Sequence, residues 1–373
     1  NTTGNVAAKA LVTNLGEITA DGGRVNIAAL STEVGALVVN QQGLVQARSL
    51  ESRGGEIVLS GGGSNEMRVA GTLDASGTTA KVAGGTVQMG AGALRVDGAS
   101  VDVSGTSGGS VLGLAGGVMV SPESSFKADG SAGKGGALVL LGVSSLHADG
   151  RFSAAGATDG GAIVFSGKSV EVGNGAVVGA AGGTGANGRW LVQSTNDLTV
   201  TGDAIAYQSA GYVDANATSR VSDAALGQAL GRGTDVTLSS KAAVIPGEPS
   251  TGGAGVTFAE NAQVIKTEGP ATTLQVDSRT SIAMNGGSVI RSLGTPLNVN
   301  FNADAQGDPL PEQQVIQSLG GSSSTPLQAG VISLQGATIE SGGGNIRFYG
   351  QSDASNGRAL GAFTVPGVLV QDS

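Results

Sequence analysis

The sequence repeats one short pattern, a glycine pair followed by two apolar residues in alternating positions. Gly135-Gly136-Ala137-Leu138-Val139-Leu140 is followed 25 positions later by Gly160-Gly161-Ala162-Ile163-Val164-Phe165. The first apolar residue of the pattern falls at Val25, Ile57, Val87, Val111, Leu138, Ile163 and, with Asn187-Gly188 in place of the glycine pair, Trp190. Intervals of 24 to 32 residues between these positions are typical of a solenoid, in which each unit stacks on its neighbours.

The composition excludes the common alternatives for so much glycine. The chain has 373 residues, of which 66 are glycine, 3% are aromatic and 13% are charged, so it is poor in the large side chains of an ordinary globular core. Collagen would need glycine at every third position and much more proline than the 9 present. Valine, leucine and isoleucine return at regular positions, which argues against disorder. An ordered, repetitive chain is predicted.

Each repeat contains three short alternating segments separated by glycine or Asp-Gly turns. One repeat reads Val87 to Met89, Leu94 to Val96 and Val101 to Val103. Alternation with period two directs one set of side chains inward and the other outward, and glycine permits corners with positive φ. The prediction is an all-β fold, a right-handed parallel β-helix that forms a three-sided solenoid with coils about 4.8 Å apart.

The pattern is interrupted twice. β-helix coils are predicted for residues 1–202 and continue over 234–373, with an excursion from the stack at 203–233 between them. A loop insertion is predicted near 308–328, where proline, glutamine, glycine and serine dominate. These two extra-helical excursions are the places where any specificity is expected.

The first excursion is expected to carry one short α-helix. Ser222 is a suitable N-cap, Leu226 and Leu230 have helical spacing, and Gly231 can end the helix. Helical spacing replaces strand alternation here, so the helix is expected to lie outside the stack of coils.

Charge and cysteine content exclude several classes of partner and site. The net charge of -9 and the pI of about 4.7 argue against nucleic acid or an anionic membrane surface as a partner. The absence of cysteine excludes disulfides and thiolate metal sites. No apolar run reaches the length of about 18 residues that a membrane span requires. Asn1 opens directly into repeat-like sequence, so the chain is expected to be a piece of a longer protein.

Several segments resemble one family of exported proteins. Leu15 to Ala29 and Val38 to Ala47 resemble the coils of filamentous-haemagglutinin-like exoproteins, which are exported by two-partner secretion. Gly188-Arg189-Trp190-Leu191-Val192 resembles the Trp-Leu signature that closes a run of coils in the high-molecular-weight adhesins of this family. Ala229 to Leu238 is similar to the helix and strand that follow there, and Gly336 to Ile346 to later coils. The similarity covers nearly the whole chain, and the ordered succession of Trp-Leu, helix and Asp-Val-Thr-Leu strand is its most specific part.

The resemblance implies a non-enzymatic adhesin, secreted or held at the surface of a Gram-negative bacterium or in its biofilm matrix. The implied partners are an extracellular glycan or exopolysaccharide, or a host-surface receptor, and an outer-membrane two-partner-secretion transporter for export of the parent protein. The family's Asn-Pro-Asn-Gly secretion motif is absent, which implies a piece downstream of the secretion domain.

Two other functions remain open at this stage, a passive stalk that presents a distal binding tip and a polysaccharide-degrading enzyme. Glycoside hydrolysis needs two carboxylates that converge across a cleft. Acidic residues such as Asp21, Asp97, Asp129 and Asp149 instead stand in Asp-Gly turns. No catalytic, cofactor or metal residues are predicted, and His147, the single histidine, is expected at the surface.

Three aromatic residues are the candidate ligand-binding residues. Trp190 could stack on a sugar, although its position in the repeat also fits a core or end-cap role. Tyr207 and Tyr212 lie off the repeat pattern, on the excursion, where loops often carry binding residues. Docking of the excursion on its scaffold is the alternative role for both tyrosines.

Overall fold

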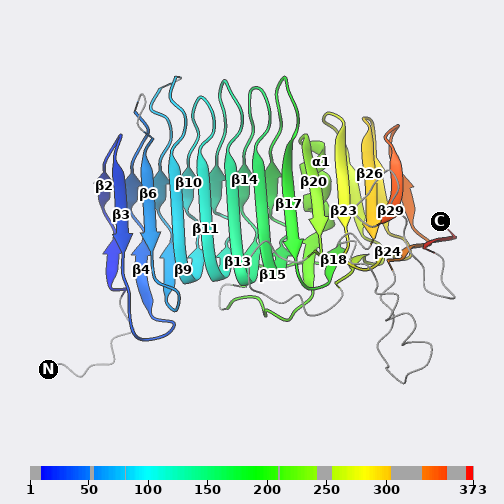
Figure 1. Cartoon of the computed structure of the whole chain (residues 1–373), viewed down its shortest axis with the longest axis horizontal. Coiled ribbons are helices and arrows are strands. Elements are labelled where there is room, and N and C mark those ends of the chain that lie inside the picture. The colour runs from blue at the N-terminus through cyan, green and yellow to red at the C-terminus, as the bar shows by residue number, and fades with distance from the viewer. Residues whose placement is uncertain are drawn as a thin grey trace, which may run out of the picture.

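The chain forms an elongated body in which short strands lie side by side along the long axis (Figure 1). The computed structural model describes residues 10–50, 54–79, 81–208, 211–241, 254–303, 330–350 and 367–372. The fold of these residues is almost all β with one α-helix, and every pairing between their named strands is parallel. The predicted all-β, parallel architecture is confirmed. The insertion predicted near 308–328 lies outside the described residues.

The strands form three columns, and a typical repeat contributes one strand to each. The first column contains β3 (Arg24–Ala28), β6 (Glu56–Ser60), the first parts of β9 (Thr86–Val96), β11 (Ser110–Val120), β13 (Ala137–Ala148) and β15 (Ala162–Val172), then β17 (Gly188–Ser194), β20 (Thr234–Ser239), β23 (Thr272–Asp277), β26 (Leu297–Ala303) and β29 (Ile346–Gly350). The second column contains β1 (Val12–Asn14), β4 (Leu37–Gln41), β7 (Glu66–Val69), the later parts of β9, β11, β13 and β15, then β19 (Ser219–Ser222), β18 (Leu198–Thr201), β21 (Val256–Phe258), β24 (Ile282–Met284), β27 (Ile332–Gln335) and β30 (Val368–Gln371). The two columns together form the large sheet.

The third column is divided into two smaller sheets. The first comprises β2 (Glu17–Thr19), β5 (Leu44–Gln46), β8 (Thr72–Asp74), β10 (Ser100–Asp102), β12 (Ser125–Lys127), β14 (Arg151–Ser153) and β16 (Val177–Gly179). The second comprises β22 (Gln263–Lys266), β25 (Val289–Ser292) and β28 (Thr338–Glu340).

The strand register confirms the repeat deduced from the sequence. The seven marker positions pair in order along the first column, as Val25, Ile57, Val87, Val111, Leu138, Ile163 and Trp190. All seven side chains are buried. The inward residues of the columns form one continuous apolar core, so each repeat buries the faces of its neighbours.

The glycine pairs are required by the close approach of stacked backbones. A Cβ on Gly108 would lie 1.9 Å from the carbonyl oxygen of Ala128 in the next repeat, and a Cβ on Gly109 would lie 2.0 Å from that of Gly85 in the preceding repeat. Positive φ, expected at the glycine corners, occurs at Gly22 but at neither member of this pair. The expectation of positive φ was therefore wrong for this pair. Glycine is needed there because one member contacts the next repeat and the other contacts the preceding repeat.

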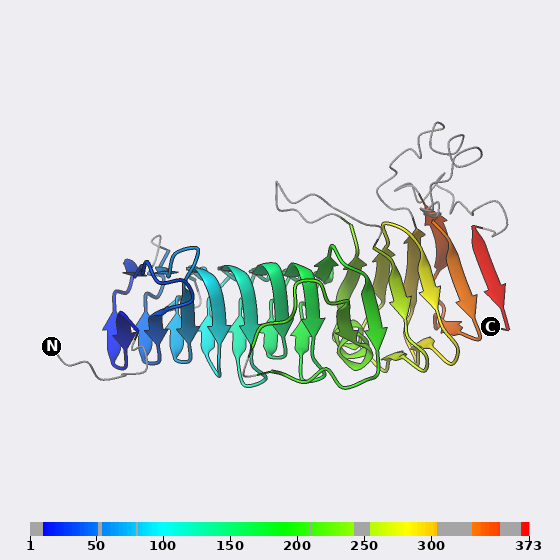
Figure 2. The same cartoon turned by 90° about the horizontal axis from the view of Figure 1, so that it is seen from below.

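The α-helix α1 (Asp223–Gly231) is present as predicted, but it is part of the stack. Ser222 is its N-cap, with the hydroxyl accepting from the backbone N–H of Ala225 at 3.4 Å. The helix contacts β16 and β22, the two strands between which the third column is interrupted (Figure 2). A Cβ on Gly227 would lie 2.4 Å from the carbonyl oxygen of Ile265 on β22. The expectation that the helix lies outside the stack was therefore wrong. The helix occupies the place of a strand in the third column and packs its buried face against the core.

One strand of the second column is out of sequence order. β19 pairs with β15 on one side and with β18 on the other, so the later strand lies between two earlier ones. The connection from β18 to β19, described for residues 202–208 and 211–218, is called the strap below. Figure 2 shows it as a green tube that lies across several neighbouring strands. Among the described residues, no helix has the length and apolar character needed to cross a membrane.

Candidate functional site

An open groove of about 710 Å³ runs across five repeats of the first column. It lies where the chain turns into the first column, at the start of β9, β11, β13, β15 and β17. Its lining comprises the glycine pairs and the residue that follows each of them, from Gly84, Gly85 and Thr86 in the first repeat to Asn187, Gly188 and Arg189 in the fifth. Because neither glycine can carry a side chain, the floor of the groove is backbone.

One carbonyl in each glycine pair points out of the fold. The N–H of Gly109 donates to the carbonyl of Val103 across the corner of its own repeat at 2.8 Å. In a trans peptide the N–H and the preceding C=O point in opposite directions, so the carbonyl of Gly108 points outward. No peptide bond is cis, and the equivalent N–H groups of Gly85, Gly136, Gly161 and Gly188 donate in the same way.

These outward carbonyls form a row along the floor of the groove. The row comprises the carbonyls of Gly84, Gly108, Gly135, Gly160 and Asn187, and no described residue donates a hydrogen bond to any of them. They stand one strand spacing apart, about 4.8 Å. The groove therefore presents hydrogen-bond acceptors at a regular interval to whatever lies in it.

The edges of the groove carry few charges. Lys134 and Asp159 pair at 2.9 Å beside it, and the Lys134 hydrogen bond lowers the pKa of Asp159. The Thr86 and Ser110 hydroxyls lie 3.3 Å apart within it. The lining residues include one cation, Arg189, and no carboxylate. Acid-base chemistry of the glycosidase kind therefore has no pair of groups in this groove.

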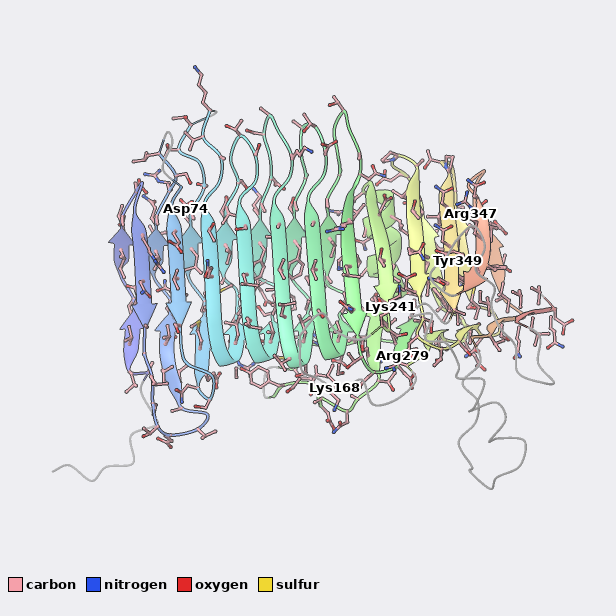
Figure 3. All side chains as sticks on the ribbon, viewed as in Figure 1. Asp74, Lys168, Lys241, Arg279, Arg347 and Tyr349 are labelled. Carbon is pink, nitrogen blue, oxygen red and sulfur yellow. The ribbon has the colours of Figure 1, made fainter. Side chains whose placement is uncertain are left out.

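A second candidate region is the outward surface of the first column beyond β17, called the polar face here. It consists of Thr237, Gln275, Asp277, Asn300, Asn302, Arg347 and Tyr349, which occupy two outward positions on β20, β23, β26 and β29. Figure 3 shows Arg347 and Tyr349 on this part of the molecule, with Lys241 and Arg279 toward the edge of the sheet.

The polar face is organised around Asp277. Its carboxylate accepts from Gln275 Nε2 at 2.7 Å and from Asn302 Nδ2 at 3.1 Å, and it lies 3.6 Å from Lys241 Nζ. Gln275 Nε2 also donates to the Tyr349 hydroxyl at 2.9 Å. Burial raises the pKa of Tyr349 above its ordinary value of 10.0. The network holds an aromatic ring and several amides in place on the surface.

Trp190 lies in the core and not at a ligand-accessible surface. Its side chain is fully buried, pairs in register with Ile163 and Val236, and meets the ring of Phe165 edge-on at 5.8 Å between centroids. Of the two structural roles open to it from the sequence, the core role is the one observed. Strand β20 continues the stack beyond it, so it does not cap an end.

Tyr207 and Tyr212 attach the strap to the second column. The Tyr207 hydroxyl donates to Asp97 Oδ1 at 2.5 Å, and burial raises the pKa of Tyr207 to about 12. The Tyr212 ring packs on Gly117, where a Cβ would lie 2.8 Å from Cδ1, and under the Arg95 guanidinium at 5.3 Å from the ring centroid. Burial also raises the pKa of Tyr212. Both rings dock on the scaffold.

His147 was expected at the surface, and this expectation was wrong. Its position on β13 does face outward, in register with Arg95 and Met119 of earlier strands, but the side chain is fully buried. The Tyr207 ring of the strap lies 5.7 Å from the imidazole, whose Nδ1 lies 3.2 Å from Glu171 Oε2. The strap covers an outward position, which the alternation of residues on β13 alone does not reveal.

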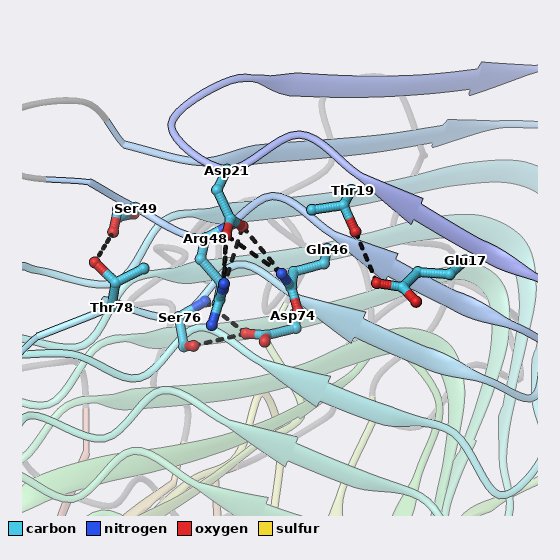
Figure 4. Close-up of polar contacts among 9 residues, drawn as sticks. All are labelled: Glu17, Thr19, Asp21, Gln46, Arg48, Ser49, Asp74, Ser76 and Thr78. Carbon is cyan, nitrogen blue, oxygen red and sulfur yellow. Dashed lines mark hydrogen bonds and ion pairs between the residues drawn. The ribbon is translucent and has the colours of Figure 1, made fainter.

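The Asp-Gly turn carboxylates accept hydrogen bonds from the following repeat. Asp21 accepts from the backbone N–H of Arg48 at 3.0 Å and pairs with its guanidinium, and this side-chain hydrogen bond lowers the Asp21 pKa (Figure 4). Asp129 accepts from Ala155 N at 2.9 Å, and Asp149 from Gly175 N at 2.7 Å. These aspartates have structural partners, as turn residues should. The described residues include no group of three or more His, Cys, Asp or Glu that could hold a metal ion.

Sequence reasoning placed the candidate ligand-binding residues at Trp190, Tyr207 and Tyr212, and in neither of these two regions. The glycine pairs were recognised as corners, but the outward carbonyls depend on backbone direction. The polar face had a signal, since Gln275 and Asn300 alternate with buried Leu274 and Val299, and Arg347 precedes the partly buried Phe348. Comparison of the chain with protein-family models and with curated protein sequences finds no match.

Proposed function

We propose that the chain is a right-handed, three-sided parallel β-helix that serves as an adhesin rod. It binds an extracellular polysaccharide in the biofilm matrix or on a host surface, has no catalytic activity, and is exported to the surface of a Gram-negative bacterium by two-partner secretion. The three columns of parallel strands support the architecture, and the family resemblance of the repeats supports the location and the export route.

The groove of outward carbonyls is the observation that carries the binding proposal. A site that repeats at equal intervals over five repeats matches a ligand that repeats as well, which is a linear polymer. Carbonyl oxygens accept hydrogen bonds, so the ligand must supply donors such as hydroxyl groups. Each repeat adds one acceptor about 4.8 Å further along the axis, so an extended chain that offers hydroxyl groups repeatedly along its length can bond to several of them. A neutral polysaccharide aligned with the long axis fits these conditions.

A passive stalk is the second candidate function. It is favoured by the regular register of the first column, which continues from β3 to β29 with the same inward position buried in almost every strand. A stalk needs only this stacking and makes no use of the groove. A polysaccharide-degrading enzyme ranks below both, because no carboxylate lines the groove.

Blocking the groove separates an adhesin from a stalk. The double variant Ala137→Gln/Ala162→Gln places two neutral side chains over the groove from outward positions of β13 and β15. Binding of immobilised neutral polysaccharides, measured by pull-down across a panel of linear glucans, mannans and galactans, should fall about tenfold, the effect of losing one or two hydrogen bonds.

Ala283→Gln is the matched control, since Ala283 occupies an outward position of β24, away from the groove lining. It should leave polysaccharide binding unchanged. Equal binding by the groove variant and the control, or binding of the wild type only to a protein receptor, would contradict the groove as the glycan site. Failure of the wild type to bind any partner, with adhesion of the parent protein retained, would favour the stalk.

A further inference from the structure

We infer that the polar face is a second binding site, for a sugar that carries a carboxylate. This inference deepens the proposed function by naming a ligand class, and it rests on the chain being a glycan-binding rod. The site lies on β23, β26 and β29, beyond the repeats that line the groove. Its chemistry differs from that of the groove, because its side chains and not its backbone would make the contacts.

Tyr349 is positioned as a platform for a sugar ring. In the strand register it stands opposite Asn302, which in turn stands opposite Asp277. Its hydroxyl nevertheless accepts from Gln275, two strands away, so the side chain crosses β26 along the sheet surface. An aromatic ring held along a surface can pack against the apolar face of a sugar while its polar tip stays bonded to the protein.

Arg347 supplies the positive charge beside this platform. It is exposed, follows Gln275 and Asn300 in one outward position, and its guanidinium has no hydrogen bond or ion pair with another described residue. Arginine presents a planar fork of donors that matches a carboxylate in a bidentate arrangement. An unpaired guanidinium next to an aromatic ring therefore favours an acidic sugar over a neutral one.

The local charge supports the same ligand. Although the whole chain has a net charge of -9, Lys241, Arg279 and Arg347 all lie on this region, and Figure 3 shows them there. The nearby carboxylate of Asp277 already has a counter-ion, Lys241 Nζ at 3.6 Å. An incoming carboxylate would therefore meet the Arg347 guanidinium rather than an uncompensated Asp277 carboxylate.

Asn302 provides an independent indication of a missing partner. Its side chain is 3% exposed, and Nδ2 donates to Asp277, but Oδ1 is buried without a hydrogen-bond partner. Buried polar atoms are rarely left unpaired. This oxygen is closed to solvent, so a ligand hydroxyl would pair with it only after the side chain turned outward, whereas the amide of the half-buried Asn300 in the neighbouring outward position is directly available to a hydroxyl.

The test compares polygalacturonate with its carboxyl-reduced form, which keeps the sugar rings and hydroxyls but loses the charge. The wild-type chain should bind polygalacturonate about tenfold more tightly than the reduced polymer, as measured by isothermal titration calorimetry. Arg347→Gln should lose that preference, whereas Arg347→Lys should retain part of it. Tyr349→Phe should keep most of the binding of polygalacturonate, and Tyr349→Ala should lose about tenfold in affinity for it.

Arg24→Gln is the matched charge control, because Arg24 is an exposed arginine at the other end of the first column. Circular dichroism and thermal unfolding of every variant confirm that the fold is kept. Equal affinity for both polymers, or equal losses in Arg24→Gln and Arg347→Gln, would overturn the inference. Binding of neutral polymers at the groove without any binding of polygalacturonate overturns this inference alone. Binding of polygalacturonate that depends on Arg347, without any binding of neutral polymers, would contradict the groove proposal and leave this inference standing.

Discussion

One outward position of the first column changes character along the length of the molecule. In the middle repeats it holds Leu112, Val139, Val164 and Leu191, and in the C-terminal repeats it holds Thr237, Gln275, Asn300 and Arg347. The inward neighbours stay apolar throughout, from Val111 to Val299. Folding therefore constrains the inward position in both regions and leaves the outward position free to differ.

The corner that precedes these strands changes at the same place. In the middle repeats the second glycine of each pair occupies a position that holds Thr234, Thr272 and Leu297 in the C-terminal repeats. The groove ends at this change, since its last lining residue is Arg189. The middle repeats thus offer a groove of bare backbone beside outward leucine and valine side chains, whereas the C-terminal repeats offer the polar face.

The largest effect is expected where the middle repeats have no room for a side chain. Gly109→Ala would place Cβ 2.0 Å from the Gly85 carbonyl oxygen, and backbone atoms of a stacked repeat cannot move aside cheaply. The free energy of unfolding should fall by about 4 kcal/mol or more, measured by chemical denaturation. A variant that is insoluble because it does not fold would agree with this prediction.

Gly90→Ala is the control, taken from the preceding repeat. Gly90 faces outward on β9, and a Cβ there would have no atom within 4 Å. The substitution should be neutral or stabilise the fold by about 0.5 kcal/mol, because alanine restricts the unfolded chain. Similar stability of Gly109→Ala and Gly90→Ala would show that close stacking is not what distinguishes the middle repeats.

A smaller effect is expected from loosening the strap over the middle repeats. Tyr212→Ala removes a ring that packs on Gly117 and beneath Arg95, and should lower the free energy of unfolding by about 2 kcal/mol. Limited proteolysis should then cut the strap faster than in the wild type. Tyr212→Phe should behave like the wild type or better, because the Tyr212 hydroxyl is buried without a partner. Unchanged cleavage in the alanine variant would mean that other contacts hold the strap.

The repetitive part of the fold was predictable from particular residues. The recurrence of Val25, Ile57, Val87 and Val111 placed the inward position, and the three short segments per repeat placed the three columns. These features are local in sequence, because each strand alternates and each repeat copies the last. The N-cap of α1 at Ser222 was predictable for the same reason.

What escaped prediction depends on contacts between distant parts of the chain. The burial of His147 requires the strap, which comes from a later segment, and the insertion of β19 between β15 and β18 reverses the sequence order. The groove depends on the direction of backbone carbonyls, which no residue type encodes. Tyr349 became a candidate only when its hydroxyl was seen to reach Gln275.

The smallest effects on stability are expected at two aspartates, Asp149 and Asp21. Both precede a glycine in a turn, but their surroundings differ. Burial raises the Asp149 pKa above its ordinary value of 3.8, so folding favours the protonated form. The contribution of Asp149 to the free energy of unfolding is then most favourable below pH 3.8, and it declines as the pH rises toward the folded-state pKa. The Arg48 hydrogen bond lowers the Asp21 pKa, so the stability that Asp21 contributes is present above 3.8 and declines as pH falls toward its folded-state pKa.

Replacing each aspartate with asparagine should therefore have opposite consequences. At neutral pH, Asp149→Asn keeps an acceptor for Gly175 N, removes a buried charge and should raise the free energy of unfolding by at most about 1 kcal/mol. Asp21→Asn should lower it by less than about 1 kcal/mol, because the ion pair with Arg48 is partly exposed. Both differences from the wild type should shrink in acid, as followed by urea titrations across the pH range. The same sign for both variants at neutral pH would mean that burial does not separate the two turns.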